Sequence, residues 1–466
     1  MRIRLRARGD LQPPSHAYGR RRAAGSGARP WSDPASLCPA ALLAAAACSA
    51  MPAAAGGLFL YEFGTAEVGL AAAGYAARAQ DASTAFTNPA GMTRLDGTQV
   101  LAGGQLIRLN TRFSIGEGTT PALGSSDGGR VFGSNGVVPG GGVFVAHSVS
   151  PDLKLGFSAT GNFGSILDYD AGWVGRYRAQ EATLIGVSFV PSVAYRVNEH
   201  LSLGAGINVM YGVMGQKVAV NNVVPGAADG RLEFDDTAWG MGGNLGLLYA
   251  WSPTTRVGLT WTSEIKLDFK AQPQFSGLGP VLSTLLRNRG LLDAQLNAGV
   301  RVPQQVMASG FTQIDDRWAV MGNVGWQQWS RFGEVEIGID NSNNPVGLTT
   351  AIPFKDTWHV AAGAQYQLSG PWRLNFGVAY DSGFQSGSRV TPLLPVNSAW
   401  RFGLGGEQQL SPTAKWGIAG SVISGGTLDV EKTSVLPPAL GGRGNLVGEY
   451  RNTAAVVLSV YGNWAF

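Results

Sequence analysis

The carboxyl-terminal segment of this chain alternates between apolar and polar positions and ends on an aromatic residue. Its apolar positions are Tyr450, Ala454, Val456, Leu458, Val460, Trp464 and Phe466. A period of two places such residues on one face of a β-strand rather than along a helix. The two final aromatics stand where a bilayer-spanning strand has an interfacial girdle. The segment therefore predicts the closing strand of an outer-membrane β-barrel.

The same alternation recurs along the chain, and residues 256–270 show it most fully. Odd positions from Val257 to Phe269 are mostly apolar, whereas even positions include Lys266, Asp268 and Lys270. Charged side chains are very costly against lipid. We therefore expect the odd face to contact lipid and the even face to line a polar lumen.

Fourteen such segments follow residue 96. They cover 97–115, 138–149, 153–166, 182–197, 201–219, 232–250, 255–270, 297–314, 317–339, 357–368, 372–384, 398–410, 414–432 and 449–466. Turns of two to four residues alternate with long loops between them. An even strand number with this rhythm is typical of an outer-membrane barrel. A soluble β-sandwich also has many short strands but lacks the rhythm. The prediction is an all-β protein whose residues 97–466 form a transmembrane antiparallel β-barrel of fourteen strands.

The composition agrees with a membrane barrel and argues against a nucleic-acid partner. Glycine accounts for 67 of 466 residues and charged residues for only 14%, against a usual quarter or so. The formal charge of +4 comes from the first 55 residues, which hold eight of the 35 basic and two of the 31 acidic residues. The remaining 27 basic and 29 acidic residues give no electrostatic support for binding nucleic acid.

Residues 1–55 read as a secretory leader. An arginine-rich stretch precedes an apolar run, Ala40–Ala47, and the small residues 53–55, which is the order of a cleavable signal. Both cysteines, Cys38 and Cys48, fall within it, so the mature chain would have no thiol or disulfide chemistry. Alternatively, Cys48 would be a lipid-modified amino terminus, although Ala45–Ala47 before it is a weak signal for this modification.

Residues 56–96 do not alternate, and we expect them to form a hatch inside the barrel. They contain an alanine-rich stretch, 71–77, that favours short helices which pack closely. A fourteen-strand barrel is too wide for its own side chains to fill. A small-residue segment on the periplasmic side suits a plug for this lumen. The alternative is a flexible tail in which Asn88-Pro89 is merely a turn.

Several short motifs, in this order, resemble the FadL family of outer-membrane transporters for long-chain fatty acids and other hydrophobic compounds, which includes the TodX-type aromatic hydrocarbon channels. They are Tyr61-Glu62-Phe63-Gly64, Asn88-Pro89-Ala90, Trp173-Val174-Gly175-Arg176-Tyr177, Pro191-Ser192-Val193-Ala194-Tyr195-Arg196, Asn244-Leu245-Gly246-Leu247-Leu248-Tyr249, Asp316-Arg317-Trp318-Ala319 and Trp329-Ser330-Arg331-Phe332. The resemblance covers nearly all of the chain after residue 56. It implies a fourteen-strand barrel, a mostly helical hatch in the lumen, and a lateral opening through a kinked third strand.

The resemblance assigns two sets of site residues. Asn88, Pro89 and Ala90 would be the hatch motif. The third strand contains Gly161-Asn162-Phe163-Gly164, where two glycines permit a kink or bulge at the lateral opening.

The long loop 271–296 is the candidate ligand groove. Leu278, Val281, Leu282, Leu285 and Leu286 fall on one helical face, with Arg287 and Arg289 nearby to attract a carboxylate. An exposed apolar patch on an outer loop is costly unless it binds something. The equally acceptable alternative is a loop helix that packs on its own barrel.

An enzyme and an open porin are the competing classes. The mature histidines are His147, His200 and His359; two lie at short turns, and we interpret His359 at a strand end as structural. We expect no catalytic residue, metal site or cofactor. The prediction is a passive, hatch-gated uptake channel in the outer membrane of a Gram-negative bacterium, with an open diffusion porin and a barrel hydrolase as alternatives. Its expected partners are outer-membrane lipid, a fatty acid or hydrocarbon, and the barrel-assembly machinery, which would recognise Phe466.

Overall fold

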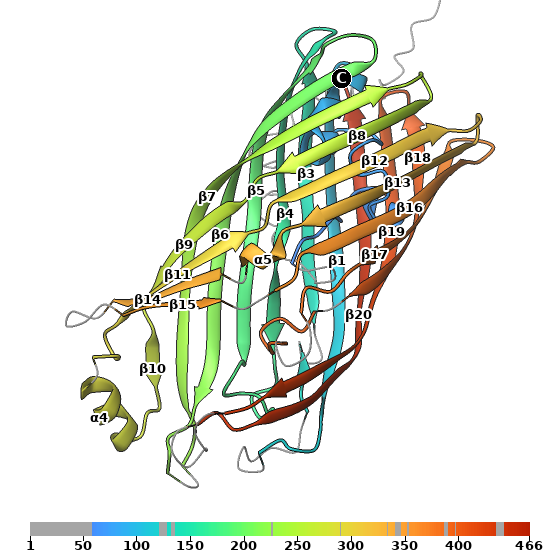
Figure 1. Ribbon diagram of the computed structural model, residues 1–466. Coiled ribbons are helices and arrows are strands. Elements are labelled where there is room, and N and C mark those ends of the chain that lie inside the picture. Colours follow the sequence, from blue (N-terminus) through green and yellow to red (C-terminus); the bar gives the residue numbers. More distant parts are fainter. Residues whose placement is uncertain are drawn as a thin grey trace, which may run out of the picture.

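The computed structural model is a closed antiparallel β-barrel with a plugged lumen (Figure 1). It describes residues 58–120, 128–131, 136–224, 227–288, 290–332, 334–340, 346–351, 354–385, 390–396, 398–434 and 442–466. The predicted leader therefore lies outside the described residues. None of the helices in this described part is long and apolar enough to cross a membrane.

Ten of the barrel spans are single strands. They are β1 (Thr98–Ile115), β3 (Val137–Ser148), β4 (Leu153–Asp168), β5 (Glu181–Arg196), β6 (Leu201–Val220), β7 (Gly230–Ala250), β17 (Trp372–Asp381), β18 (Ala399–Ser411), β19 (Ala414–Lys432) and β20 (Leu446–Ala465). Each pairs with its sequence neighbour, and β20 pairs with β1 from Gln99↔Ala465 to Ile115↔Gly448. The last strand therefore closes the barrel, as predicted.

The other four spans are each built from two strands. The pairs are β8 (Thr255–Thr262) with β9 (Ile265–Ala271), β11 (Gln295–Val302) with β12 (Gln305–Gln313), β13 (Trp318–Gln327) with β14 (Glu334–Asp340), and β15 (Val346–Ala351) with β16 (Thr357–Gln367). The pieces nearer the long loops, β15-β14-β11-β9, form a separate four-stranded sheet. The total of fourteen spans agrees with the prediction, but the sequence analysis did not detect these breaks.

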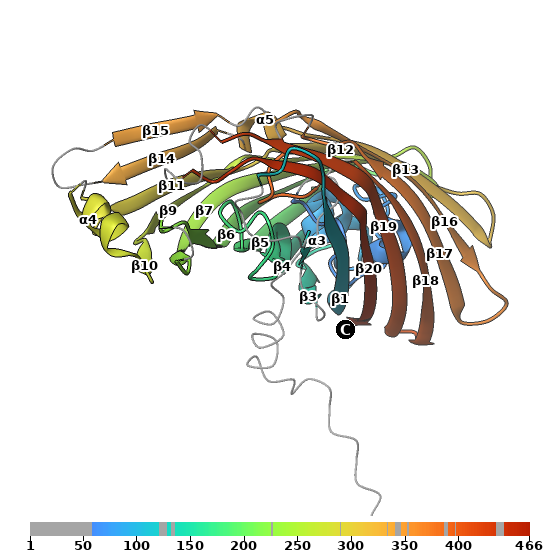
Figure 2. The same cartoon turned by 90° about the horizontal axis from the view of Figure 1, so that it is seen from below.

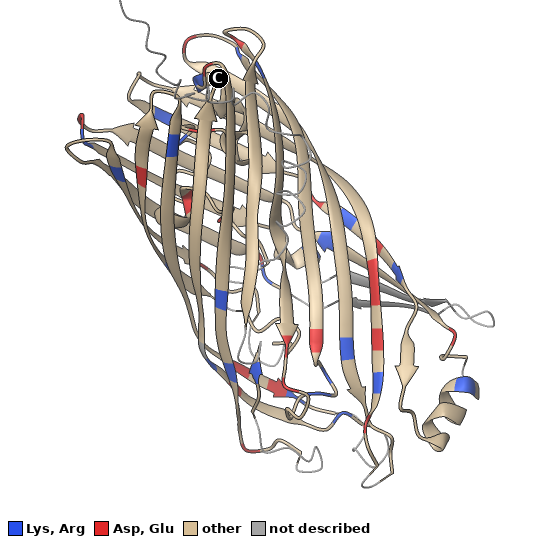
Figure 3. Ribbon diagram, turned by 180° about the vertical axis from the view of Figure 1, so that it is seen from behind, with Lys and Arg blue, Asp and Glu red and all other residues tan. Residues whose placement is uncertain are grey.

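The outer surface of the barrel has an apolar band between two aromatic belts. Side chains such as Leu404 and Leu458 are 59% and 60% exposed, as lipid-facing residues should be. On β13, the outward-facing Trp318 and Trp326 are eight residues apart, or about 26 Å along the strand. The strands in Figure 3 have few charged residues along their middle. The band marks the bilayer, with the long loops on its outer side and the short turns on its periplasmic side.

The prediction for residues 256–270 is wrong beyond the break. Leu259 faces outward on β8, but Leu267 and Phe269 on β9 are buried in the barrel, whereas Lys266 and Asp268 are exposed. The break at Ser263 and Glu264 shifts the alternation by one residue. Above the bilayer the outer face is in water, so the apolar residues turn inward.

The final strand changes face in the same way. Val456 to Trp464 face lipid as predicted, but Tyr450 is fully buried. The register between β19 and β20 shifts at Gly426, which pairs with Thr453, and this position lies between Tyr450 and the lipid-facing part of β20. On β19, Ile418 is 50% exposed, whereas Leu428 is buried. The strict polarity repeat therefore applies only within the bilayer.

Residues 58–96, here called the hatch, occupy the lumen, as predicted. They contain α2 (Glu67–Leu70), α3 (Thr84–Thr87) and the 3₁₀-helix η2 (Pro89–Arg94) joined by turns, and residues 58–78 and 81–93 are all buried. Figure 2 shows these helices within the ring of strands. Glycines of the wall permit this packing: a Cβ on Gly258 would lie 1.9 Å from the Ala76 carbonyl oxygen.

Candidate functional site: the hatch, the aromatic cluster and the β4 bulge

Asn88 joins the hatch to the wall. Its side-chain Nδ2 donates to the carbonyl oxygens of Ala76 at 2.7 Å and Leu247 of β7 at 3.0 Å. Its Oδ1 accepts from the Ala90 N–H at 3.1 Å and so caps η2, which begins at Pro89. A Cβ at Gly246 would lie 2.1 Å from this Oδ1. The predicted hatch motif therefore connects two hatch turns with one wall strand.

A fully buried charge cluster fixes the amino-terminal part of the hatch. The Arg401 guanidinium on β18 donates to both oxygens of Glu62 at 2.5 and 2.6 Å, and to Asp381 of β17 at 2.5 Å. Asp381 also contacts His359 Nδ1 at 2.7 Å, and the His359 ring lies 4.4 Å from the ring of Tyr61. Charges buried in this way are tolerated only when they are paired. The cluster therefore couples the hatch tightly to the wall.

A second buried cluster lies within the hatch itself. Arg78 contacts Glu67 and Asp81, each at 2.8 Å. Burial by itself would raise the pKa of Asp81, but the nearby cations Arg78 and Lys415 outweigh it and hold that pKa well below its usual range. Asp81 is therefore a carboxylate at neutral pH and stabilises the fold of the hatch.

Six aromatic side chains, one from the start of the hatch and five from the barrel and its loops, form what we call the aromatic cluster. Its members are Phe59, Phe163, Trp329, Phe332, Phe354 and Phe384. Ring centroids are 5.4 Å apart for Phe59 and Phe163, and 5.0 Å apart for Trp329 and Phe384. Trp329 and Phe332 come from α5 (Trp329–Phe332), which occupies the break between β13 and β14. The cluster is thus an apolar site between the hatch, β4 and the outer loops.

The four residues assigned to the lateral opening form a β-bulge in β4. Gly161 pairs with Val187 and Phe163 pairs with Gly186, so Asn162 is the extra residue. Gly164 has φ = +134°, and a Cβ there would lie 1.9 Å from the Leu184 carbonyl oxygen. The hatch contacts the bulge directly, because Leu60 N–H donates to the Asn162 carbonyl at 3.0 Å.

The barrel wall is unpaired beside this bulge. β3 and β4 pair only from Gly142↔Thr160 to Ser148↔Lys154. Beyond Thr160, β3 still pairs with β1 and β4 still pairs with β5, but β3 and β4 do not pair with each other. The bulge lies level with the outer aromatic belt. Gly161 pairs with Val187 of β5, Val187 pairs with Tyr211 of β6, and Tyr211 pairs with Trp239 of β7.

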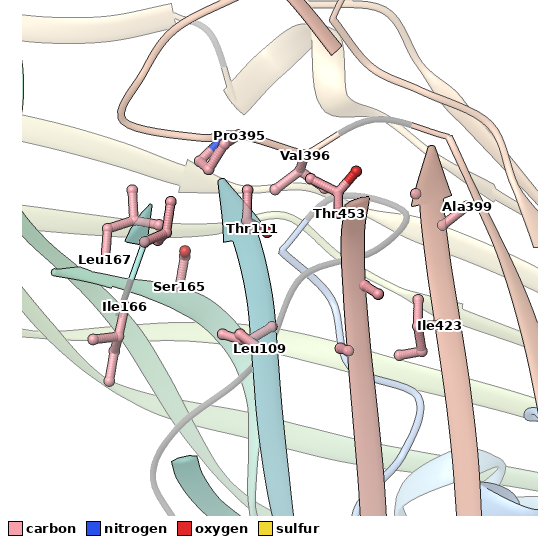
Figure 4. A pocket seen from close by; sticks show the side chains of 14 residues that line it. Leu109, Thr111, Ser165, Ile166, Leu167, Pro395, Val396, Ala399, Ile423 and Thr453 are labelled. Atoms are coloured by element: carbon pink, nitrogen blue, oxygen red, sulfur yellow. The ribbon is translucent and has the colours of Figure 1, made fainter. Parts of the chain in front are cut away.

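A small cavity lies behind the unpaired part of β4. It has a volume of about 40 Å³, which is room for very few water molecules. Figure 4 shows Ser165 and Leu167 of β4 facing Pro395 and Val396 of the inward-folded loop between β17 and β18, with Leu109 of β1 below. A hydrophobic ligand can enter this space only if the loop or the strand moves.

The predicted ligand-groove residues lie elsewhere. Val281, Leu282, Leu285, Leu286 and Arg287 belong to α4 (Pro280–Asn288), which has no buried residue and stands outside the ring of strands (Figures 1 and 2).

Leu278 precedes this helix and lies next to Gly230 at the start of β7. Arg289 lies outside the described residues. The structure therefore does not bring this set together with the aromatic cluster, and its role in ligand capture stays a prediction.

Each of the three histidines in the described chain contacts a neighbouring residue of the barrel. No group of three or more His, Cys, Asp or Glu side chains within that part is placed to hold a metal ion. His147 contacts Thr98 and His200 contacts the Ala250 carbonyl, both near short turns. His359 is buried against Asp381 in the charge cluster.

Residues 46–466 match the profile of the family described as outer membrane protein transport protein (OMPP1/FadL/TodX). The chain belongs to the FadL family of outer-membrane transport proteins. Members of this family are transporters and channels for hydrophobic compounds rather than enzymes. The family and the barrel place this FadL-family protein in the outer membrane of a Gram-negative bacterium.

Sequence relatives cover most of this FadL-family chain. It is 28% identical over 419 residues to outer membrane protein P1 of Haemophilus influenzae, which covers 81% of this chain and 89% of the relative. It is 27% identical over 372 residues to the long-chain fatty acid transport protein of Salmonella typhi, which covers 73% and 81%.

Solved structures share the fold. A Pseudomonas aeruginosa FadL homologue has a TM-score of 0.76 at 21% identity and covers 88% of this chain and 100% of its own. The Pseudomonas putida toluene transporter TodX has a TM-score of 0.62 at 15% identity and covers 83% and 94%.

The sequence analysis missed the residues that connect the hatch to the wall. Glu62 and Arg401 are 339 positions apart, and neither belongs to a recognisable charge motif. The available signal was the position of Asp381 and Arg401 on the inward-facing side of their strands, where a buried charged side chain needs a partner. Trp329 begins the motif Trp329-Ser330-Arg331-Phe332 of the family resemblance, but the sequence did not predict that these residues form the helix α5.

Proposed function

We propose that this protein is a passive, hatch-gated channel that takes up hydrophobic molecules and releases them laterally through the β4 bulge. The observation that carries the proposal is the aromatic cluster beside an unpaired stretch of wall, with Phe163 belonging to both. Burial of an apolar chain stabilises it by about 0.8 kcal/mol per CH₂ group. An apolar site beside a wall opening therefore lowers the barrier to crossing more than a water-filled pore does.

The hatch argues against the open porin. It fills the lumen with buried backbone, and the buried cluster of Glu62, Arg401 and Asp381 holds it to the wall. We propose that ions and small solutes do not pass while the hatch is docked. The names of two relatives, a long-chain fatty acid transport protein and a toluene transporter, bring both substrate classes into consideration.

The space beneath the hatch favours a lateral exit over a periplasmic one. A cavity of about 830 Å³ opens there, and its lining includes Arg94, Arg373, Glu407 and Lys415. An apolar molecule gains nothing by leaving lipid-like surroundings for this charged vestibule. Exit between β3 and β4 leads instead into the bilayer. Capture by the exposed apolar face of α4 is the proposed first step.

Deletion of Asn162 tests the lateral exit. Removing the one extra residue lets β4 pair continuously with β5, so we expect uptake of radiolabelled oleate by cells expressing the variant to fall at least tenfold. Gly310→Val is the matched control, because a Cβ there meets nothing within 4 Å. Both variants must first show the folded barrel on unheated electrophoresis gels. Normal oleate uptake by the folded deletion variant would exclude release at the bulge.

Competition between oleate and naphthalene in the same cells tests the substrate class. A fatty-acid transporter should take up oleate in the presence of excess naphthalene, and a hydrocarbon channel should show the reverse. Large steady ion currents from the intact protein in a planar bilayer would favour the open porin instead.

A further inference from the structure

A second discontinuity of the wall lies between β7 and β9. β7 pairs with β8 from Ala250↔Arg256 to Asn244↔Thr262, and with the short strand β10 (Gln274–Ser276) from Glu233↔Gln274 to Arg231↔Ser276. Residues 234–243 of β7 lie between these two ladders. They face β9, which pairs only with β11 within the described chain. We call this stretch the β7–β9 seam.

The seam is packed, but no backbone ladder joins the described strands β7 and β9 there. Ser263 exchanges two bonds of 2.8 Å with Gly243 at its lower end. The Lys270 N–H donates to the side chain of Asp236 at 2.5 Å near its upper end. Between these points the strands are close: a Cβ on Gly240 would lie 2.5 Å from the Lys266 carbonyl oxygen. Parting the strands therefore breaks van der Waals contacts rather than a backbone ladder.

The lower part of the outer side of the seam lies at the outer aromatic belt, whereas Lys266 and Asp268 of β9 face water above it. Trp239 and Met241 of β7 are 63% and 66% exposed. The Trp239 ring lies 4.9 Å from Tyr211 and 6.2 Å from Phe189, in the outer aromatic belt. Aromatic residues of this kind mark the bilayer–water interface. A molecule dissolved in the outer leaflet thus meets the lower end of the seam, beside Met241.

The inner side of the seam leads to the aromatic cluster. Ile265, Leu267 and Phe269 of β9 are almost completely buried. They belong to the same apolar core as Phe163 and Trp329. One continuous apolar region therefore connects the β7–β9 seam with the β4 bulge.

We propose that the β7–β9 seam is a second lateral portal, through which apolar molecules dissolved in the outer leaflet reach the aromatic cluster. This portal rests on the proposed transport function and adds a route of entry that does not depend on the outer loops. Its ligands are acyl chains and neutral hydrocarbons, because Ile265, Leu267 and Phe269 line its inner side. The polar Ser263 and Asp236 bound it at its two ends.

A reversible disulfide across the seam tests the portal. A Cβ on Gly242 would lie 2.7 Å from Ser263 Oγ, so Gly242→Cys with Ser263→Cys brings two thiols within bonding reach. The matched control is Leu247→Cys with Leu259→Cys, a pair directly opposite in the β7–β8 ladder. The chain's own cysteines, Cys38 and Cys48, precede residue 56 and are replaced by serine in all of these variants.

The readout is photolabelling in vesicles whose bilayer contains a diazirine-bearing stearate. Mass spectrometry measures the label on Leu267 and Phe269, which do not face lipid. We expect oxidation of the seam pair to lower this label at least tenfold, reduction to restore it, and the control pair to leave it unchanged. Equal labelling of Leu267 and Phe269 in the oxidised and reduced seam variant, or no labelling in the parent, would overturn the portal.

A second variant acts in the opposite direction and does not require a disulfide. Asp236→Ala removes the side chain that accepts from Lys270, so labelling of Leu267 should rise; labelling that does not rise also counts against the portal. Oleate uptake by the Asn162 deletion tests lateral release separately. Labelling through the seam with normal uptake by that deletion would retain the portal and reject only the exit at the bulge.

Discussion

Replacing Arg401 by methionine should release the hatch from the wall. In the parent protein the Arg401 guanidinium lies between Glu62 and Asp381, with side-chain exposures of 0%, 0% and 3% respectively. Methionine fills similar space but leaves two buried carboxylates without their cation. Removing one partner of a buried ion pair costs about 3–5 kcal/mol. This free energy corresponds to a change of about 10²- to 10⁴-fold in the ratio of docked to undocked hatch.

Single-channel recording in a planar bilayer measures this change directly. We expect Arg401→Met to show frequent ion-conducting openings and faster cleavage of the hatch by an added protease, while the barrel itself stays folded. The triple variant Glu62→Gln, Asp381→Asn, Arg401→Met removes all three charges. Its ion conductance should return most of the way to the low level of the parent. If Arg401→Met conducts no more ions than the parent and resists the protease equally well, the view that this cluster holds the hatch is refuted.

Three further predictions concern the hatch and the aromatic cluster. Asn88→Ala removes the bonds to Ala76 and Leu247 and should raise ion leakage. Gly246→Val, which places atoms where the Asn88 side chain lies, should do the same, and unchanged currents in both would exclude this docking role. Because the pKa of Asp81 is lowered on folding, its stabilising contribution is fully present above about pH 4, the unfolded-state value, and is lost as the pH falls towards the folded value. Leakage should therefore increase as the pH falls below about 4 towards the folded pKa, and Asp81→Asn should leak already at neutral pH; an Asp81→Asn variant that is as tightly closed as the parent at neutral pH contradicts this expectation. Trp329→Ala should weaken equilibrium binding of oleate about tenfold or more with the barrel intact, and unchanged binding would show that the aromatic cluster is not the ligand site.

The barrel strands could be predicted because the bilayer imposes simple rules on them. A spanning strand must satisfy every backbone group through its neighbours and must present apolar side chains to lipid. The period of two from Val456 to Trp464, and the same period in residues 255–262, follow from these rules. Strand ends at the short turns were accurate for the same reason, because these turns lie at a fixed level of the membrane. On the side of the long loops, β15 (Val346–Ala351) was missed and lies in a predicted loop.

Outside the bilayer the same reasoning failed for a physical reason. Water on the outer face removes the requirement for outward apolar residues, so Leu267 and Tyr450 turn inward and Lys266 turns outward. A shift of one residue at a break reverses every following side chain. The period of two persists through such a break, so the sequence pattern does not reveal it.

The sequence by itself determined the membrane, the number of spans and the presence of a segment that fills the lumen. Each of these depends on patterns within about 20 neighbouring residues, the length of one strand and its turn. The tertiary structure alone decided how the hatch is held and where the wall is weak. Glu62 meets Arg401 only after the barrel closes, and the unpaired stretches beside β4 and β7 exist only relative to their neighbouring strands. Contacts between distant segments, rather than any local pattern, therefore specify the candidate site.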